Sequence, residues 1–185
     1  DEALNRALPS ERERPEVLHR AMRHLVFPGG KRLRPILCRA AAMAVGGNPD
    51  DALPAAIAIE LLHTYTLIHD DLPCMDDDLE RRGQPTVHVA FGEANAVLAG
   101  DALQALAFET LAGTRGGPDG LTTHLVRELA RAAGSRGVVG GQVEDIAAAG
   151  SVPTRETLEF IHQHKTADLF CAAVRMGAMT AGADA

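Results

Sequence analysis

The residues best suited to chemistry lie in one acidic segment, DDLPCMDDDLERR, at residues 70–82. Its six carboxylates are Asp70, Asp71, Asp76, Asp77, Asp78 and Glu80. Two arginines, Arg81 and Arg82, follow them. The segment comes directly after an apolar helical pattern, where the negative end of the helix dipole disfavours carboxylates. The pattern therefore indicates a bound cation, and the oxygen ligands favour Mg²⁺ carrying a phosphorylated substrate. The alternative is a solvated acidic loop, the usual environment of a charge run.

A break in the helix would bring the aspartates together. Asp70 and Asp76 are six residues apart, so they would not align on an unbroken helix. Pro73 disfavours helical geometry at Leu72, and we expect the helix to end there. If the segment then curls back, Asp70, Asp71 and Asp76 can converge on shared cations.

The helix that leads into this segment carries further candidates. His63 and Asp70 are seven residues apart and lie nearly on one line, with Thr66 beside them. Tyr65 belongs to an adjoining stripe of bulky side chains. It precedes Asp70 by five residues, roughly 7.5 Å at the usual helical rise. At that depth a side chain could block an elongated pocket.

A second motif, GGKRLRP at residues 29–35, predicts an anion site. Lys31 and Arg34 are three residues apart and share a helix face. Glycines before a helix start, together with cations in its first turn, favour phosphate through backbone N–H groups, the dipole and the side chains. Without the acidic segment, the same string would more readily fit a cationic helix start at the surface.

Two shorter strings are weaker candidates. HQHKT at residues 162–166 contains Lys165 and Thr166, a pair that can bind phosphate or simply face solvent. GGQVEDI at residues 140–146 places Gln142 and Asp145 three residues apart in an otherwise apolar helix. Such a polar pair is either satisfied within a core or part of a site wall.

Composition limits the class of protein. The chain has 185 residues with 46% hydrophobic and 3% aromatic content, which favours helices over sheets and suffices for one domain. A net charge of −7 argues against a nucleic-acid surface. We expect no membrane span, because no apolar stretch is long enough. Three cysteines without a CxxC pair, and no signal-peptide pattern, favour the cytoplasm.

Periodicity and breakers predict the elements that position these residues. The predicted helices cover residues 15–27, 31–46, 53–71, 93–111, 121–133, 138–149 and 154–179. Residues 83–86 and 113–120 read as loops, and Thr154 as an N-cap. We expect one all-α domain over residues 1–185.

Taken together, these strings resemble the trans-prenyl diphosphate synthases, the polyprenyl synthetase family. GGKRLRP, HTYTLIHDDLPCMDDDLERRGQPT, LAGDAL, GGQVEDI and HKT occur in the family's order over nearly the whole chain. The two extra residues within the acidic motif resemble the bacterial and plant type, and the short-chain farnesyl and geranylgeranyl diphosphate synthases. The resemblance implies an isoprenoid-synthase-like helical bundle around a central cavity, usually homodimeric.

The resemblance also implies roles for single residues. Asp70 and Asp76 match ligands of Mg²⁺, with Mn²⁺ as an alternative, and Asp71 supports them. Residues that match the isopentenyl diphosphate site are Lys31, Arg34, His63 and Arg82. Residues that match contacts to the allylic diphosphate are Arg81, Lys165 and Thr166. Together with the three aspartates, Arg81 and Lys165 form the implied catalytic set, and Gln142 and Asp145 are second-tier candidates.

The implied reaction is an ionisation-first alkylation. The allylic diphosphate loses pyrophosphate, and the allylic cation alkylates the double bond of isopentenyl diphosphate in a water-excluding pocket. The resemblance further implies that an aromatic residue at the position of Tyr65, beside Thr66, favours the C15 product, farnesyl diphosphate. Geranylgeranyl diphosphate is the alternative product.

One departure from the family leaves other functions open. The family's second aspartate-rich motif, DDxxD, does not occur in this sequence, and residues 180–185 read TAGADA. The bundle is therefore expected to be incomplete at its C-terminal end. A non-catalytic partner subunit of a heteromeric synthase is one alternative, although it would not need all these ligands. A class I terpene cyclase would not need GGKRLRP or His63. A His-Asp phosphohydrolase needs further ligands on other helices than His69 and Asp70 supply.

Overall fold

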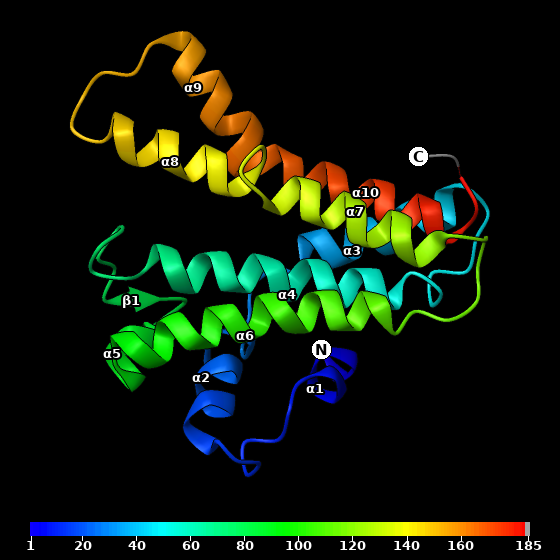
Figure 1. Ribbon diagram of the computed structural model, residues 1–185, viewed down its shortest axis with the longest axis horizontal. Helices are drawn as coiled ribbons and strands as arrows, with labels where there is room; N and C mark the ends of the chain where they lie inside the picture. The colour runs from blue at the N-terminus through cyan, green and yellow to red at the C-terminus, as the bar shows by residue number, and fades with distance from the viewer. Residues whose placement is uncertain (184–185) are drawn as a thin grey trace. The chain divides into compact units, whose positions relative to one another are not determined.

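The computed structural model describes residues 1–183, and its regular structure is almost entirely helical (Figure 1). The helices are α1 (Glu2–Ala7), α2 (Glu16–Val26), α3 (Leu33–Ala44), α4 (Leu53–Asp70), α5 (Val87–Phe91), α6 (Glu93–Ala112), α7 (Leu121–Ala133), α8 (Val138–Ala148), α9 (Arg155–Ile161) and α10 (Asp168–Thr180), with a π-helical stretch, η1 (His162–Ala167). The strands are β1 (Glu80–Arg81) and β2 (Gln84–Pro85). The prediction of an all-α fold is confirmed. The sequence missed the two short helices α1 and α5.

The chain folds as two compact units. The first contains Asp1–Arg32 and Glu60–Thr110, and the second contains Leu33–Ile59 and Leu111–Ala185. The long helices α4 and α6 each contribute residues to both units. A single domain over residues 1–185 stays a prediction, and its last two residues lie outside the described ones.

In the first unit, apolar faces of short helices cover one another. Buried side chains of α2 include Met22, Leu25 and Val26, and α2 packs against α5. The part of α4 within this unit packs against α6, where His69 Nε2 lies 3.0 Å from the Val97 carbonyl oxygen. Gly100 makes this approach possible, because a Cβ there would lie 2.1 Å from the same nitrogen.

In the second unit, α10 packs against α3 and α7. Its buried face includes Leu169, Met176 and Gly177. A Cβ at Gly177 would lie only 1.9 Å from the Cys38 carbonyl oxygen, so the two helix backbones approach closely. Burial raises the pKa of the Cys38 thiol to about 12, against the charge of Arg39, so this cysteine is a packed apolar group.

The predicted helix over residues 154–179 is present with a change of winding. Thr154 accepts a hydrogen bond from the Thr157 amide and caps α9, as the sequence predicts. The helix then widens into η1 before it continues as α10. Gly141 on α8 lies against the backbone of η1, because a Cβ there would be 2.2 Å from the Lys165 backbone nitrogen. The close approach sets Lys165 beside α8.

Two expectations from composition concern the whole chain. No helix within residues 1–183 combines the length and apolar character needed to cross a membrane. The three cysteines are free thiols, with Cys38 buried and Cys74 and Cys171 exposed. Their wide spacing predicted that no disulfide joins them.

Candidate active site

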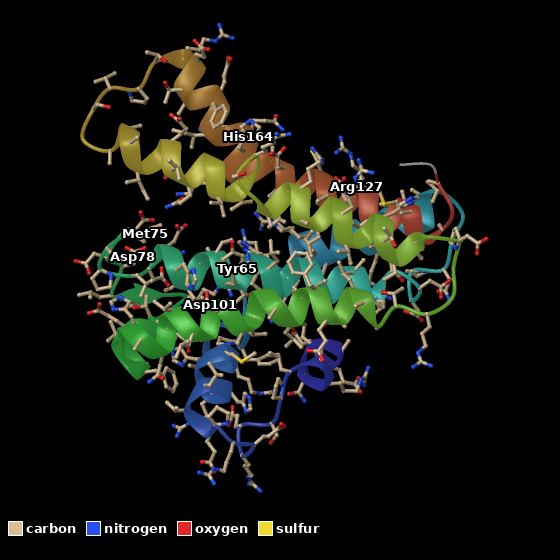
Figure 2. All side chains as sticks on the ribbon, in the orientation of Figure 1. Tyr65, Met75, Asp78, Asp101, Arg127 and His164 are labelled. Atoms are coloured by element: carbon tan, nitrogen blue, oxygen red, sulfur yellow. The ribbon has the colours of Figure 1, made fainter. Side chains whose placement is uncertain are left out.

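The acidic segment turns back on the end of α4. The Asp76 amide donates to the Asp70 carbonyl oxygen at 2.9 Å, and the Met75 amide donates to that of Leu72 at 2.8 Å. Pro73 predicts this break. The turn therefore brings Asp70 and Asp76 together along the backbone. Figure 2 shows Met75 and Asp78 in this loop, with Tyr65 set back along α4.

Asp71 has a different environment. Its side chain is fully buried, and Arg81 Nη2 lies 2.6 Å from its Oδ1. Burial raises the pKa of the Asp71 carboxyl against the influence of Arg81, and the hydrogen bond to Asp71 raises the pKa of Arg81. Arg81 also contacts Asp78 at 3.1 Å. Asp71 thus holds Arg81. A supporting role for Asp71 at cations bound by Asp70 and Asp76 stays a prediction.

The far end of the loop is fixed by its backbone. The hydroxyl of Thr86 donates to the Asp78 carbonyl oxygen at 2.8 Å, and His88 Nε2 contacts the same oxygen at 2.9 Å. Both side chains are buried. The hairpin formed by β1 and β2 lies between these anchors and carries Arg81. The sequence predicts only a loop at residues 83–86 and does not distinguish Asp78 from the other carboxylates of the acidic segment.

The donor set at the turn suits Mg²⁺. In the part of the chain that the structure describes, no three His, Cys, Asp or Glu side chains are arranged to hold a metal ion. Mg²⁺ does not require such a cage, because proteins bind it through one or two carboxylates, with water and substrate phosphates completing the octahedron. Asp76 is exposed and Asp70 partly so, and their backbones meet at the turn. The residues present therefore fit the ion.

Arg82, one of the predicted isopentenyl diphosphate residues, lies beside the glycine that precedes Lys31, another of them. A Cβ at Gly30 would lie 2.8 Å from Arg82 Nη2, so the guanidinium lies directly against this glycine. Arg82 also donates to the Leu25 carbonyl oxygen at 3.1 Å. Lys31, which follows Gly30, is exposed. Burial lowers the pKa of Arg82, and Glu60 acts in the opposite direction.

Two further charged residues of the first unit, Glu60 and Arg32, are not among the candidates that the sequence predicts. Glu60 is 2% exposed and lies within the apolar run of α4. Arg32 Nη1 contacts its Oε1 at 2.6 Å. A lone carboxylate in an apolar helical run requires a cationic partner, and this signal could have identified Glu60 from the sequence.

The chain-length candidates also lie on α4. Tyr65 is buried, and its ring meets that of His69 edge-to-face with centroids 5.5 Å apart. Burial raises the pKa of the Tyr65 hydroxyl, and the charges of Asp70 and Asp101 add to this effect. The Thr66 hydroxyl donates to the His63 carbonyl oxygen at 2.8 Å, and both side chains are partly exposed. Tyr65 thus has a fixed place on the helix that ends at Asp70.

The remaining candidates belong to the second unit. Lys165 Nζ lies 2.5 Å from Asp145 Oδ2, which joins the HKT and GGQVEDI strings. The buried Nε2 of Gln142 has no hydrogen-bond partner. Thr166 is exposed. The Arg34 guanidinium lies 4.1 Å from the centroid of the Phe170 ring. Lys165 and Asp145 therefore form an ion pair, which the sequence did not predict, because it paired Asp145 with Gln142 and Lys165 with Thr166.

Known proteins resemble this chain over most of its length. It is 52% identical to a chloroplastic geranylgeranyl pyrophosphate synthase of Capsicum annuum over 91% of this chain and 46% of the relative. It is 47% identical to a geranylgeranyl diphosphate synthase of Cyanophora paradoxa over 99% and 61%. The chain thus spans about half the length of the curated relatives it matches.

The fold has equally clear matches. The crystal structure of an apo FPP/GFPP synthase from Zymomonas mobilis matches with a TM-score of 0.93 and 44% sequence identity. The match covers 100% of this chain and 67% of that one. The model of the family described as polyprenyl synthetase matches residues 15–185. This range includes the GGKRLRP motif at residues 29–35 and the acidic segment at residues 70–82. The chain therefore belongs to the polyprenyl synthetase family.

Proposed function

We propose that the protein is a Mg²⁺-dependent prenyltransferase that condenses isopentenyl diphosphate with an allylic diphosphate, dimethylallyl or geranyl. The observation that carries the proposal is the pairing of two unlike sites in the first unit. Asp70 and Asp76 meet at the turn after α4, and Arg82 lies against Gly30 beside Lys31. One site suits a metal-bound diphosphate, and the other suits a diphosphate bound by cations alone.

The cationic residues bind and orient the substrates. Lys31 and Arg82, with Arg34 and His63 as further candidates, hold the diphosphate of isopentenyl diphosphate. Arg81, which Asp71 holds in a fixed position, contacts the diphosphate of the allylic substrate. Lys165 and Thr166 are proposed contacts to the same substrate. Fixed cations around a leaving group favour its departure, because they stabilise the negative charge that develops on it.

The proposed reaction balances without a redox partner. The C–O bond of the allylic diphosphate breaks, and pyrophosphate leaves with the electron pair. A C–C bond forms between the allylic carbon and the terminal carbon of isopentenyl diphosphate, and a proton then leaves for the pyrophosphate. When bound, Mg²⁺ neutralises diphosphate charge and assists its departure. Asp70 and Asp76 are the residues that hold it.

Two products are candidates. A buried Tyr65 five residues before Asp70 supports farnesyl diphosphate, because a rigid ring can stop chain growth. The names of the relatives support geranylgeranyl diphosphate. We further propose a homodimer, and a cytoplasmic location stays a prediction.

The test uses purified full-length protein with labelled isopentenyl diphosphate, each allylic diphosphate in turn, and Mg²⁺. We expect an elongated, acid-labile diphosphate whose formation stops with EDTA and resumes with added Mg²⁺. A protein that elongates nothing alone but stimulates another synthase would instead be a partner subunit. A cyclic hydrocarbon from farnesyl diphosphate would identify a cyclase. Chromatography of the hydrolysed product distinguishes C15 from C20.

A further inference from the structure

Glu60 is a buried carboxylate that has no substrate or metal contact in the proposed reaction. Its side chain is 3% exposed and lies among apolar residues of α4. Arg32 Nη1 contacts it at 2.6 Å. A buried carboxylate is costly unless it is paired, because desolvation disfavours its charge. An apolar residue would fill this site at lower cost, so the charge itself is expected to have a use.

Arg32 connects Glu60 to the loop that precedes α3. Its Nη2 donates to the Val26 carbonyl oxygen at 2.6 Å, and its Nε contacts Asp1 at 2.9 Å. Its backbone is in the left-handed region with φ of 52°, which disfavours a non-glycine residue. The side-chain contacts offset this strain. Gly29, also in the left-handed region, lies directly against the Arg32 guanidinium.

Arg82 holds the same loop from the hairpin. It lies against Gly30 and donates to the Leu25 carbonyl oxygen, one residue before the carbonyl that Arg32 binds. The last turn of α2 thus has two neighbouring carbonyls bound by two arginines, where the helix dipole favours cations. Lys31 lies between Gly30 and Arg32, so both of its neighbours are fixed.

We propose that Glu60 and Arg32 are positioning residues for isopentenyl diphosphate: their buried ion pair fixes the loop so that Lys31 and Arg82 are spaced to receive one diphosphate before it binds. This inference rests on the proposed function. Without the substrate, Lys31, Arg32 and Arg82 are like charges in one small region, and Glu60 offsets their repulsion. Its charge also opposes the lowering of the Arg82 pKa that burial causes. A preorganised cationic site binds more tightly, because it does not lose ordering entropy on binding.

The test measures steady-state kinetics of the full-length protein. Glu60→Gln keeps the volume and a hydrogen-bond acceptor but removes the charge. Arg32→Lys keeps the charge but loses the forked contact to Glu60 and Val26. We expect the KM for isopentenyl diphosphate to rise about tenfold in each, equivalent to about 1.4 kcal/mol. The kcat and the KM for the allylic diphosphate are expected to stay within about twofold, since they depend on other residues.

A double variant separates positioning from stability. Glu60→Met with Arg32→Met replaces the ion pair by apolar side chains, which often restores or raises stability. We expect its unfolding midpoint to match the wild type while the KM for isopentenyl diphosphate stays high. Asp50→Asn, which breaks the exposed Arg39–Asp50 pair in the second unit, is the control and should change neither.

Each outcome decides the proposal. A double variant with wild-type KM would show that the pair is structural only, and an unchanged KM in Glu60→Gln or Arg32→Lys would also overturn the inference. If Glu60→Gln does not fold, the KM values of Arg32→Lys and of the double variant decide whether the ion pair positions the substrate site or is structural only. A wild-type protein without prenyltransferase activity would instead refute the proposed function, and isothermal titration with isopentenyl diphosphate would then test binding alone.

Discussion

The three aspartates Asp70, Asp71 and Asp76 belong to one acidic motif but have different environments. Asp70 and Asp76 meet through the backbone of the turn, while the Asp71 carboxylate is buried and holds Arg81 at 2.6 Å. The sequence could predict the turn, because Pro73 restricts the residue before it. It could not predict which carboxylate turns inward, because that choice depends on the position of Arg81 on a two-residue strand.

Tyr65 offers a test of product length at the residue scale. Tyr65→Ala removes a buried ring set back along α4 from Asp70. We expect the main product to lengthen by at least one five-carbon unit, because the chain can then grow past this position. Product chromatography after dephosphorylation is the measurement. Val17→Ala, at an exposed position of α2, is the control. The same product distribution in Tyr65→Ala and wild type would rule out this role.

At the scale of elements, the sequence predicted the long helices well and the short ones poorly. The patterns over residues 93–111 and 121–133 correspond to α6 and α7, because apolar periodicity and glycine breakers agree there. The helix α5 and the strands are too short to show periodicity. The π-helical stretch was also missed, because its sequence, HQHKTA, contains no glycine or proline to mark a change of winding.

The packing of α10 on α3 gives a prediction at this scale. Gly177→Ala places a methyl group 1.9 Å from the Cys38 carbonyl oxygen, so the helices must separate. We expect the free energy of unfolding to fall by about 1–3 kcal/mol, the usual cost of overpacking. Urea denaturation measures it. Val174→Ala, at an exposed position of the same helix, should change it by less than about 0.5 kcal/mol. Equal stability of the two variants would show that the helices can adjust.

At the scale of the whole molecule, acid stability depends on carboxylates with cationic partners. Glu128 on α7 contacts Arg131 at 3.0 Å and Arg175 of α10 at 3.1 Å. Burial opposes its ionisation, but the hydrogen bonds from both arginines outweigh burial and hold the pKa of Glu128 below its ordinary value. The unfolded chain therefore binds this proton more readily, and stability is lost as pH falls through the folded-state pKa.

This linkage predicts a pH-dependent difference between two variants. At pH 7, the free energy of unfolding of Glu128→Gln should be about 1 kcal/mol lower than that of wild type. The loss is small because both arginines are half exposed and water screens their charge. The difference should shrink as pH falls below the ordinary glutamate value of 4.5. Urea denaturation at several pH values measures it, and Glu156→Gln, at an exposed site, is the control. A constant difference between pH 7 and pH 3 would contradict the linkage.

The widened winding of η1 has a consequence for how related chains can differ in length. A π-helical turn holds one more residue than an α-helical turn, so it acts as an insertion absorbed without a loop. Loss of one residue from His162–Ala167 would let the segment rewind as α-helix, so the flanking helices would keep their faces while residues within the stretch, Lys165 among them, would shift in register. Homologues that lack this residue would need to recruit a different side chain to contact Asp145. Alignments of such chains should therefore be made by the position of that contact, not by uninterrupted helical spacing.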